Sequence, residues 1–172
     1  WSTVGLQGTG RKCIVIADVF VPAHRAMATG ELFEGTSIYA QAHPSFSFQF
    51  PVLCTLTYFL TAPALAITNR IYDEFINLTS VRRDRYDGAS KAAKPTVQAR
   101  VAESWAEICS AELLVKEIGD LYDRAGAARE AFDVQTRLEV KMRASYAMKL
   151  CRNAADRLYD AAGANSIYER SP

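Results

Sequence analysis

Apolar side chains recur every three or four residues over a long segment that starts at Pro95. This spacing places them along one face of an α-helix. The pattern is carried by Val97, Val101, Ser104, Ile108, Ala111, Val115, Ile118 and Tyr122. Pro95 suits the first turn of a helix, where its missing N–H needs no partner, and Gly126 is predicted to end the helix. At about 1.5 Å per residue such a helix is roughly 40 Å long, so it needs other long helices to cover its apolar face.

Two further segments show helical patterns. One runs from Pro51 to about Leu78, and the other from Asp133, a predicted N-cap, to Gly163. The inner face of the last segment is predicted to carry Leu138, Ser145, Ala147, Cys151, Ala154 and Leu158. Three long helices with short connections favour an antiparallel bundle, and such bundles usually have four helices. We therefore expect a mainly α fold in which the fourth helix is missing.

The N-terminal part has a different pattern. Residues 13–21 are rich in β-branched side chains and are closed by Pro22, which predicts one β-strand, or two joined by a bulge near Asp18. A single strand needs a neighbour for its backbone hydrogen bonds, so its sheet is expected elsewhere. The chain starts at Trp1 without an initiating Met, and we expect it to be a piece of a longer protein.

Charge and cysteine usage exclude several classes of protein. Twenty basic and 19 acidic side chains give a net charge of +1, whereas a nucleic-acid-binding protein normally has a clear excess of Lys and Arg. The four cysteines form no C-x-x-C pair, and His24 and His43 lack metal-ligand spacing. We expect no metal site, reduced thiols in the cytoplasm, and loop or surface positions for both histidines.

The stretch from Gly35 to Asn69 contains no Asp, Glu, Lys or Arg. A buried core helix is favoured over a membrane span, because threonines and prolines interrupt the stretch and Arg70 and Asp73 follow it. The aromatic side chains around this stretch either fill the core or form the wall of an apolar ligand pocket. They are Phe33, Tyr39, Phe46, Phe48, Phe50, Tyr58 and Phe59.

No catalytic arrangement of residues is evident. Glu103 and Glu107 share a helix face with Arg100 one turn earlier, which favours solvated ion pairs over an acid–base pair. Arg82, Arg83 and Arg85 precede the second long helix, where they form either a solvated loop or a clamp for a pyrophosphate.

Three short segments carry a family resemblance: residues 1–10 (WSTVGLQGTG), 15–25 (VIADVFVPAHR) and 161–164 (AAGA), with RSP at 170–172. Together they resemble the acyl-CoA dehydrogenase superfamily. More narrowly, they look like its flavin-dependent monooxygenase branch, which includes the oxygenase components of p-hydroxyphenylacetate and steroid-phenol hydroxylases. The resemblance implies that residues 1–25 end a middle β domain and residues 26–50 form an aromatic-rich connecting loop. Residues 51–172 would then be a truncated C-terminal helical bundle of a tetrameric protein.

The resemblance also implies a flavin site, for either FMN or FAD. Arg83 and Arg85 match the arginine segment before the second bundle helix, and Gly163 and Ala164 match the turn after the third, which in the family bind the flavin of a neighbouring subunit. Asp160 stands where the dehydrogenases commonly have Gln, a departure that bears on dinucleotide binding. Tyr39, Phe46 and Phe48 are expected to wall the substrate pocket. The catalytic residues are expected outside the chain.

The function implied by the resemblance is hydroxylation of a small aromatic substrate with O2 and reduced flavin that a separate reductase supplies. Two alternatives remain at this stage. One is an acyl-CoA dehydrogenase that oxidises an acyl thioester at its α,β position, and the other is a non-catalytic helical oligomerisation module. We expect neither a nucleic-acid nor a membrane partner.

Overall fold

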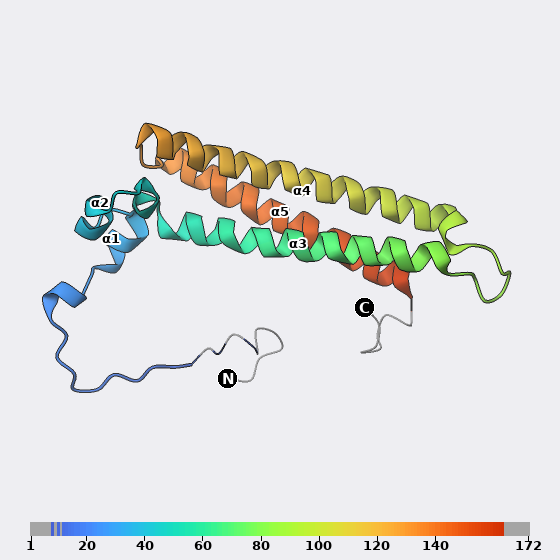
Figure 1. Ribbon diagram of the computed structural model, residues 1–172, viewed down its shortest axis with the longest axis horizontal. Coiled ribbons are helices and arrows are strands. Elements are labelled where there is room, and N and C mark those ends of the chain that lie inside the picture. Colours follow the sequence, from blue (N-terminus) through green and yellow to red (C-terminus); the bar gives the residue numbers. More distant parts are fainter. Residues whose placement is uncertain (1–7, 9, 11, 164–172) are drawn as a thin grey trace.

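The molecule is built on three long helices that lie side by side and alternate in direction (Figure 1). The computed structural model describes residues 8, 10 and 12–163. The long helices are α3 (Val52–Val81), α4 (Pro95–Ala128) and α5 (Val134–Ala162). Helix α5 packs along both of the others. The predicted antiparallel arrangement of three long helices in a mainly α fold is confirmed.

Local sequence signals set most of the helix ends. Pro51 precedes α3, and Pro95 occupies the first turn of α4. The Asp133 carboxylate caps α5 by accepting a hydrogen bond of 2.7 Å from the backbone N–H of Thr136. Gly163 follows the last residue of α5 with a φ of 78°, in the left-handed region that glycine adopts without strain.

Helix α4 extends two residues beyond its predicted end at Gly126. The helix passes through Gly126 and ends at Ala128, and Arg129 takes the left-handed conformation at its C-terminus. The N–H groups of Arg129 and Glu130 then bond to the carbonyls of Gly126 and Ala125 at 3.3 and 3.0 Å. These bonds satisfy carbonyls that would otherwise lack a partner at a helix end.

The core forms where the three long helices meet. Ser104, Ile108, Ala111 and Ile118 are buried, which confirms the predicted inner face of α4. On α5 the predicted face is correct from Ala147 onward, but Leu138 and Ser145 are exposed and Val140 and Ala144 are buried instead. A helix turns by about 100° per residue, so an error of one or two positions moves a side chain off the buried face.

Helix α3 buries only a narrow line of side chains: Cys54, Thr61, Thr68, Phe75 and Thr79. The prediction of a buried core helix therefore holds only along this line and is wrong for the rest of α3. Leu56, Phe59 and Ile67 are more than half exposed. Among the described helices, α3 is the one long and apolar enough to cross a membrane, with a hydropathy of 1.4 over its most apolar window and 17% of that window buried. The expectation that it does not do so stays a prediction.

Residues 12–22 form no β-strand, contrary to the prediction. The chain is extended there, and Ile14, Val15 and Phe20 are exposed. A strand is defined by hydrogen bonds to a neighbouring strand, and the described part of the chain offers none. Asp18, the predicted bulge position, has a left-handed φ of 52°.

The segment between residues 23 and 50 folds into short helices at the start of α3 (Figure 1). They are η2 (Ala23–Arg25), α1 (Thr29–Glu34), α2 (Ile38–Ala42) and η3 (Phe46–Gln49). Gly35 ends α1 with a φ of 69°. An ion pair between Glu34 and Arg137 joins α1 to α5.

Candidate functional site

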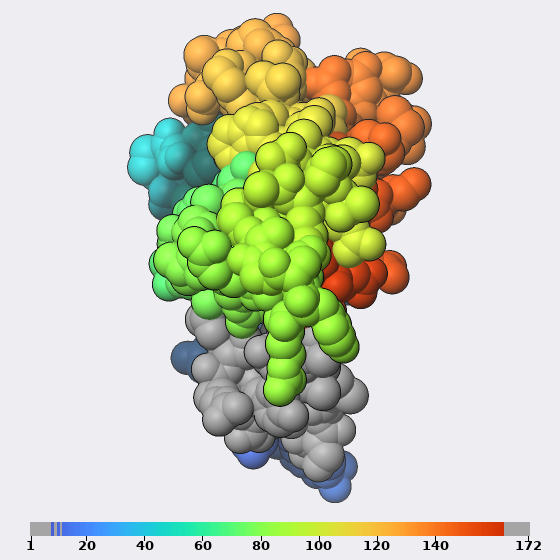
Figure 2. All heavy atoms as spheres, turned by 90° about the vertical axis from the view of Figure 1, so that its right-hand side faces the viewer, coloured from blue at the N-terminus to red at the C-terminus, as the bar shows by residue number. Residues whose placement is uncertain are grey.

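The first candidate site is the connection between α3 and α4, residues 82–94, which includes the 3-10 helix η4 (Lys91–Ala93). We call it the basic connection. Figure 2 looks onto this end of the bundle, with the connection (green) nearest the viewer and the end of α5 (red) beside it. Two backbone hydrogen bonds close it, from the N–H of Asp84 to the Ala89 carbonyl at 2.8 Å and from the N–H of Lys91 to the Arg82 carbonyl at 3.0 Å.

Asp84 organises the basic connection from within. Its carboxylate pairs with Lys94 and accepts a hydrogen bond of 2.9 Å from the backbone N–H of Tyr86. The hydrogen bond from Lys94, followed by that from the Tyr86 N–H, lowers the pKa of Asp84 from 3.8 to about 2. Sequence reasoning missed both Asp84 and Lys94, because their pairing depends on the way the connection folds back on itself.

Arg82 links the basic connection to the end of α5. Its Nη1 donates a hydrogen bond of 3.2 Å to the carbonyl oxygen of Ala162, one of the last carbonyls of a helix and therefore without a helical partner. Gly163 follows directly. The arginine cluster and the glycine turn are thus brought to the same end of the bundle, although by Arg82 rather than by the predicted Arg83 or Arg85.

The predicted flavin-binding residues lie on either side of this contact. Arg83 is exposed and donates to the Gly88 carbonyl at 3.2 Å, whereas Arg85 is exposed and makes no ion pair within the described residues. Ala164 lies outside the described residues. Exposed guanidinium groups suit a phosphate, so Arg83 and Arg85 fit the phosphate-bearing part of a flavin nucleotide.

We expect Asp84→Asn to loosen the basic connection. An amide binds Lys94 more weakly than a carboxylate does, so trypsin should cleave after Arg85 several times faster than in the parent chain. Because its pKa is lowered in the folded protein, Asp84 contributes stability above pH 3.8, and this contribution is lost as the pH falls towards 2. The Tyr86 amide signal in NMR should titrate with a midpoint near pH 2 and lose this step in Asp84→Asn.

The exposed carboxylate of Asp123 on α4 provides the matched control. Asp123→Asn should leave both the cleavage rate and the Tyr86 titration unchanged. Equal cleavage of Asp84→Asn and the parent chain would show that Asp84 does not organise the connection.

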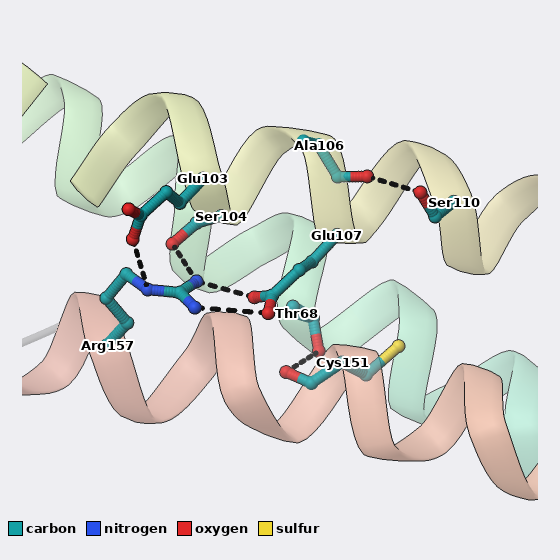
Figure 3. A network of polar contacts seen from close by, with 8 residues as sticks. All are labelled: Thr68, Glu103, Ser104, Ala106, Glu107, Ser110, Cys151 and Arg157. Carbon is teal, nitrogen blue, oxygen red and sulfur yellow. Dashed lines mark hydrogen bonds and ion pairs between the residues drawn. The ribbon is translucent and has the colours of Figure 1, made fainter. Parts of the chain in front are cut away.

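Glu103 and Glu107 belong to a contact between helices (Figure 3). Arg157 on α5 reaches across to α4, with its Nη2 3.1 Å from Glu107 Oε1 and its Nε 3.1 Å from Glu103 Oε2. Its Nη1 also donates to the buried Ser104 hydroxyl at 3.2 Å. The sequence interpretation that paired these carboxylates with Arg100 is therefore wrong. Both are held by one guanidinium and join two helices, which leaves no free acid–base pair.

Some side chains of the aromatic-rich segment lie in the core, and others line a pocket. Phe46 is 8% exposed and packs edge-on against Phe50, with ring centroids 5.4 Å apart. Phe50 also contacts Tyr122 and Phe132, with centroids 4.7 and 5.0 Å away. Burial here raises the pKa of Tyr122 to about 12. Phe46, a predicted substrate contact, therefore lies in the core.

Tyr39 and Phe48, the other two predicted substrate contacts, line a cavity of about 530 Å³ formed by η2, α1, α2 and η3. We call it the N-terminal pocket. His24, Arg25 and His43 also line it, and the His43 ring lies 3.9 Å from that of Phe48. Both histidines were expected merely in loops or on the surface. Their position beside the aromatic-rich segment is the signal that could have assigned them to a pocket.

Among the described residues, the remaining reactive side chains form neither a metal site nor a reactive thiol. The described residues contain no group of three or more His, Cys, Asp or Glu side chains able to hold a metal ion. Cys54 and Cys151 are buried free thiols, and burial raises the pKa of each. A raised pKa keeps a thiol protonated and makes it a poor nucleophile.

Residues 58–172 match the family model described as "Acyl-CoA dehydrogenase, C-terminal domain". The chain therefore belongs to this family. It is 26% identical over 172 residues to the p-hydroxyphenylacetate 3-hydroxylase oxygenase component of Acinetobacter baumannii, covering 99% of this chain and 41% of that protein. It is 29% identical over 175 residues to the FADH2-dependent resorcinol hydroxylase oxygenase component of a Rhizobium species, covering 95% of this chain and 42% of that protein.

The same fold occurs in the crystal structure of a 3-HSA hydroxylase from Rhodococcus sp. RHA1. The TM-score is 0.86 at 23% identity, and the match covers 100% of this chain and 45% of that one. The chain thus spans less than half the length of the relatives that it matches.

Proposed function

We propose that this chain is part of the oxygenase component of a two-component flavin-dependent monooxygenase that hydroxylates a small aromatic substrate. The observation that carries the proposal is the alignment of nearly the whole chain with oxygenase components of two aromatic hydroxylases. Two features of the structure support it. The basic connection meets the end of α5, and the separate N-terminal pocket has aromatic walls.

In this proposal the basic connection holds the phosphate of the flavin. Arg83 and Arg85 would bind the phosphate oxygens, while Gly163 and Ala164 would let the backbone approach them closely. FMN and FAD both carry phosphate, so these residues suit either, and the FADH2 dependence of the Rhizobium relative favours FAD. Arg82 and Asp84 position the connection, since one ties it to α5 and the other holds its turn.

A bound reduced flavin would supply two electrons to O2, so that one oxygen atom forms the ring hydroxyl and the other leaves as water. The described residues contribute the surroundings. Tyr39 and Phe48 would hold the aromatic ring in the N-terminal pocket.

We further propose a homotetramer in the cytoplasm that works with a separate flavin reductase. The exposed apolar side chains of α3, among them Leu56, Phe59 and Ile67, support burial against another part of the assembly. The tetramer would place the basic connection of one subunit near the flavin of its neighbour, as the family resemblance implies.

The decisive experiment uses the full-length protein that contains this chain. Chemically reduced FMN or FAD, a phenolic substrate and isotopically labelled O2 are mixed without reductase, and the product is analysed by mass spectrometry. We expect a ring-hydroxylated product carrying one labelled oxygen atom. Arg83→Gln combined with Arg85→Gln should raise the flavin concentration needed for half-maximal product at least tenfold, because two phosphate contacts are lost.

Two outcomes would reject the proposal. Oxidation of an acyl thioester by oxidised flavin, without incorporation of oxygen, would assign the protein to the dehydrogenases. Absence of flavin binding and of any product would favour the helical oligomerisation module.

A further inference from the structure

The basic connection contains the one Asp-Gly pair of the chain, Asp87-Gly88. In such a pair the backbone nitrogen of the glycine can attack the side-chain carboxyl carbon of the aspartate. Glycine has no Cβ, so its nitrogen reaches that carbon with less hindrance and its backbone adapts to the ring that forms. Every other aspartate of the chain is followed by a residue with a Cβ. Asp87 is therefore the aspartate whose neighbour hinders this reaction least.

Both members of the pair are open to water. The Asp87 side chain is 58% exposed. Gly88 is also exposed and has a φ of 68°, and nothing lies within 4 Å of the position that a Cβ would take. The pair lies in a turn between α3 and α4 rather than within a helix, so no helical hydrogen bond holds the Gly88 nitrogen. The turn has room for the five-membered ring that the attack would form.

Two hydrogen bonds set the geometry of the pair. Asp87 Oδ1 accepts from the N–H of Ala89 at 2.9 Å. This bond closes a ring that includes the Gly88 nitrogen, so it keeps the carboxyl group beside its attacker. The Gly88 N–H donates to the Asp84 carbonyl oxygen at 3.1 Å and must release it before the nitrogen reacts. Such a bond costs little to open at an exposed position, because water replaces it.

We propose that Asp87-Gly88 is a site of spontaneous modification at which aspartate is converted to isoaspartate. The Gly88 nitrogen loses its proton and bonds to Asp87 Cγ, while one carboxyl oxygen leaves as water, which gives a cyclic succinimide. Water then adds to one of the two ring carbonyls. Addition at the former backbone carbonyl breaks its bond to the Gly88 nitrogen, so the chain now runs through the side chain. One water is lost and one is gained, and no oxidant or reductant takes part.

Isoaspartate lengthens the main chain by one methylene inside the basic connection. The Asp84 N–H donates to the Ala89 carbonyl at 2.8 Å across this stretch, and Arg83 donates to the Gly88 carbonyl at 3.2 Å. A longer main chain between the paired groups changes their register, so both contacts are lost. Arg83 and Arg85 are then no longer held in place. The effect on flavin rests on the proposed function, whereas the modification itself does not.

The test uses the full-length protein that contains this chain, incubated at neutral pH and body temperature for several weeks. Tryptic peptides are separated and assayed with an isoaspartate-specific methyltransferase. We expect isoaspartate, at unchanged mass, and succinimide, lighter by one water, in the peptide 86–91. They should accumulate at least tenfold faster than in the peptide 117–124, which carries Asp120 and Asp123 on α4. Asp120 and Asp123 are exposed as well, so the comparison isolates the effect of the turn and its glycine.

Asp87→Glu is the matched variant. It keeps the carboxylate, but its longer side chain must close a six-membered ring, which forms far more slowly, so the modification should be absent. The amides of Asp84 and Lys91, both hydrogen-bonded across the connection, report its opening. Their hydrogen exchange should speed up at least tenfold in the modified fraction of the parent protein and stay constant in incubated Asp87→Glu. The modified fraction should also need several times more flavin for half-saturation.

Equal rates of isoaspartate formation in the two peptides would overturn the inference, and so would the same modification in Asp87→Glu. Unchanged hydrogen exchange in the modified fraction would show that the connection stays closed and would refute the loss of the two contacts. Failure of the proposed function has a different signature. If the modified protein exchanges faster but binds flavin as before, the modification stands, and the phosphate-binding role of Arg83 and Arg85 is rejected.

Discussion

Gly35→Ala is expected to detach α1 and α2 from the start of α3. Gly35 is buried and has a φ of 69°, where a residue with a Cβ is disfavoured by about 1–2 kcal/mol. The added Cβ would also lie 2.6 Å from the carbonyl carbon of Gln49, which is backbone and cannot rotate away. We expect these two costs to weaken the docking of the short helices, because isolated helices of this length are not stable in water.

The expected measurement for Gly35→Ala is hydrogen exchange. Protection of the amides of Ala40 and Phe50, both in hydrogen-bonded positions of this segment, should fall at least tenfold, while amides in the middle of α4 and α5 keep their protection. The N-terminal pocket should lose its shape at the same time, because α1 and α2 form its walls.

Gly30→Ala is the matched control for this prediction. Gly30 lies inside α1, with nothing within 4 Å of its added Cβ, and alanine favours a helix over glycine by about 1 kcal/mol. Gly30→Ala should keep or increase protection in the segment. Wild-type protection in Gly35→Ala would mean that the contact between Gly35 and Gln49 does not hold the short helices in place.

Arg157→Met is expected to lower the free energy of unfolding by about 2 kcal/mol. Met fills a similar volume but leaves Glu107 and the buried Ser104 hydroxyl without their shared partner. The side chains of Arg157 and Glu107 are 24% and 19% exposed, so the cost is smaller than for a fully buried pair. The hydrogen bonds that Arg157 donates to Glu107, together with the charges of Glu107 and Glu103, raise the pKa of Arg157, so it stays charged. In a chain of this size the melting temperature should fall by about 4–8 °C.

Arg152→Met tests whether this loss is specific to the interhelical contact. Arg152 lies on the same helix and pairs with Asp156, but the two side chains are 81% and 67% exposed. Its replacement should cost less than about 0.5 kcal/mol. Similar melting temperatures for both variants would show that the contact of Arg157 with α4 adds nothing to stability.

Helical periodicity predicted the three long helices because their apolar side chains face one another along most of their length. The prediction of the inner face of α4 was correct for this reason. The exposure of α3 could not be predicted in the same way, because Leu56, Phe59 and Ile67 are as apolar as core residues and periodicity does not say which apolar face meets a partner. The helix end at Arg129 escaped prediction because a left-handed arginine has no compositional signal.

The candidate sites were predictable to different degrees. Arg83, Arg85 and Gly163 came from a family resemblance, and the structure supplied the contact between Arg82 and Ala162 that brings their segments together. Pairings such as Asp84 with Lys94, or Arg157 with Glu107, depend on how distant segments pack. Tyr39 and Phe48 were predicted from aromatic composition alone, which could not separate them from the core residue Phe46.

The packing of α3 against α5 has a consequence for the order of folding. Contacts such as Thr68 with Cys151 and Cys54 with Arg137 join residues 83 positions apart, whereas α4 and α5 are separated by a short turn. Loop closure therefore favours early pairing of α4 with α5 and late docking of α3. During synthesis at about 5–20 residues per second, α3 leaves the ribosome roughly 4–16 s before its partner. The apolar surface of α3, the most apolar of the three long helices, is thus exposed for the longest time before another helix of the chain buries it.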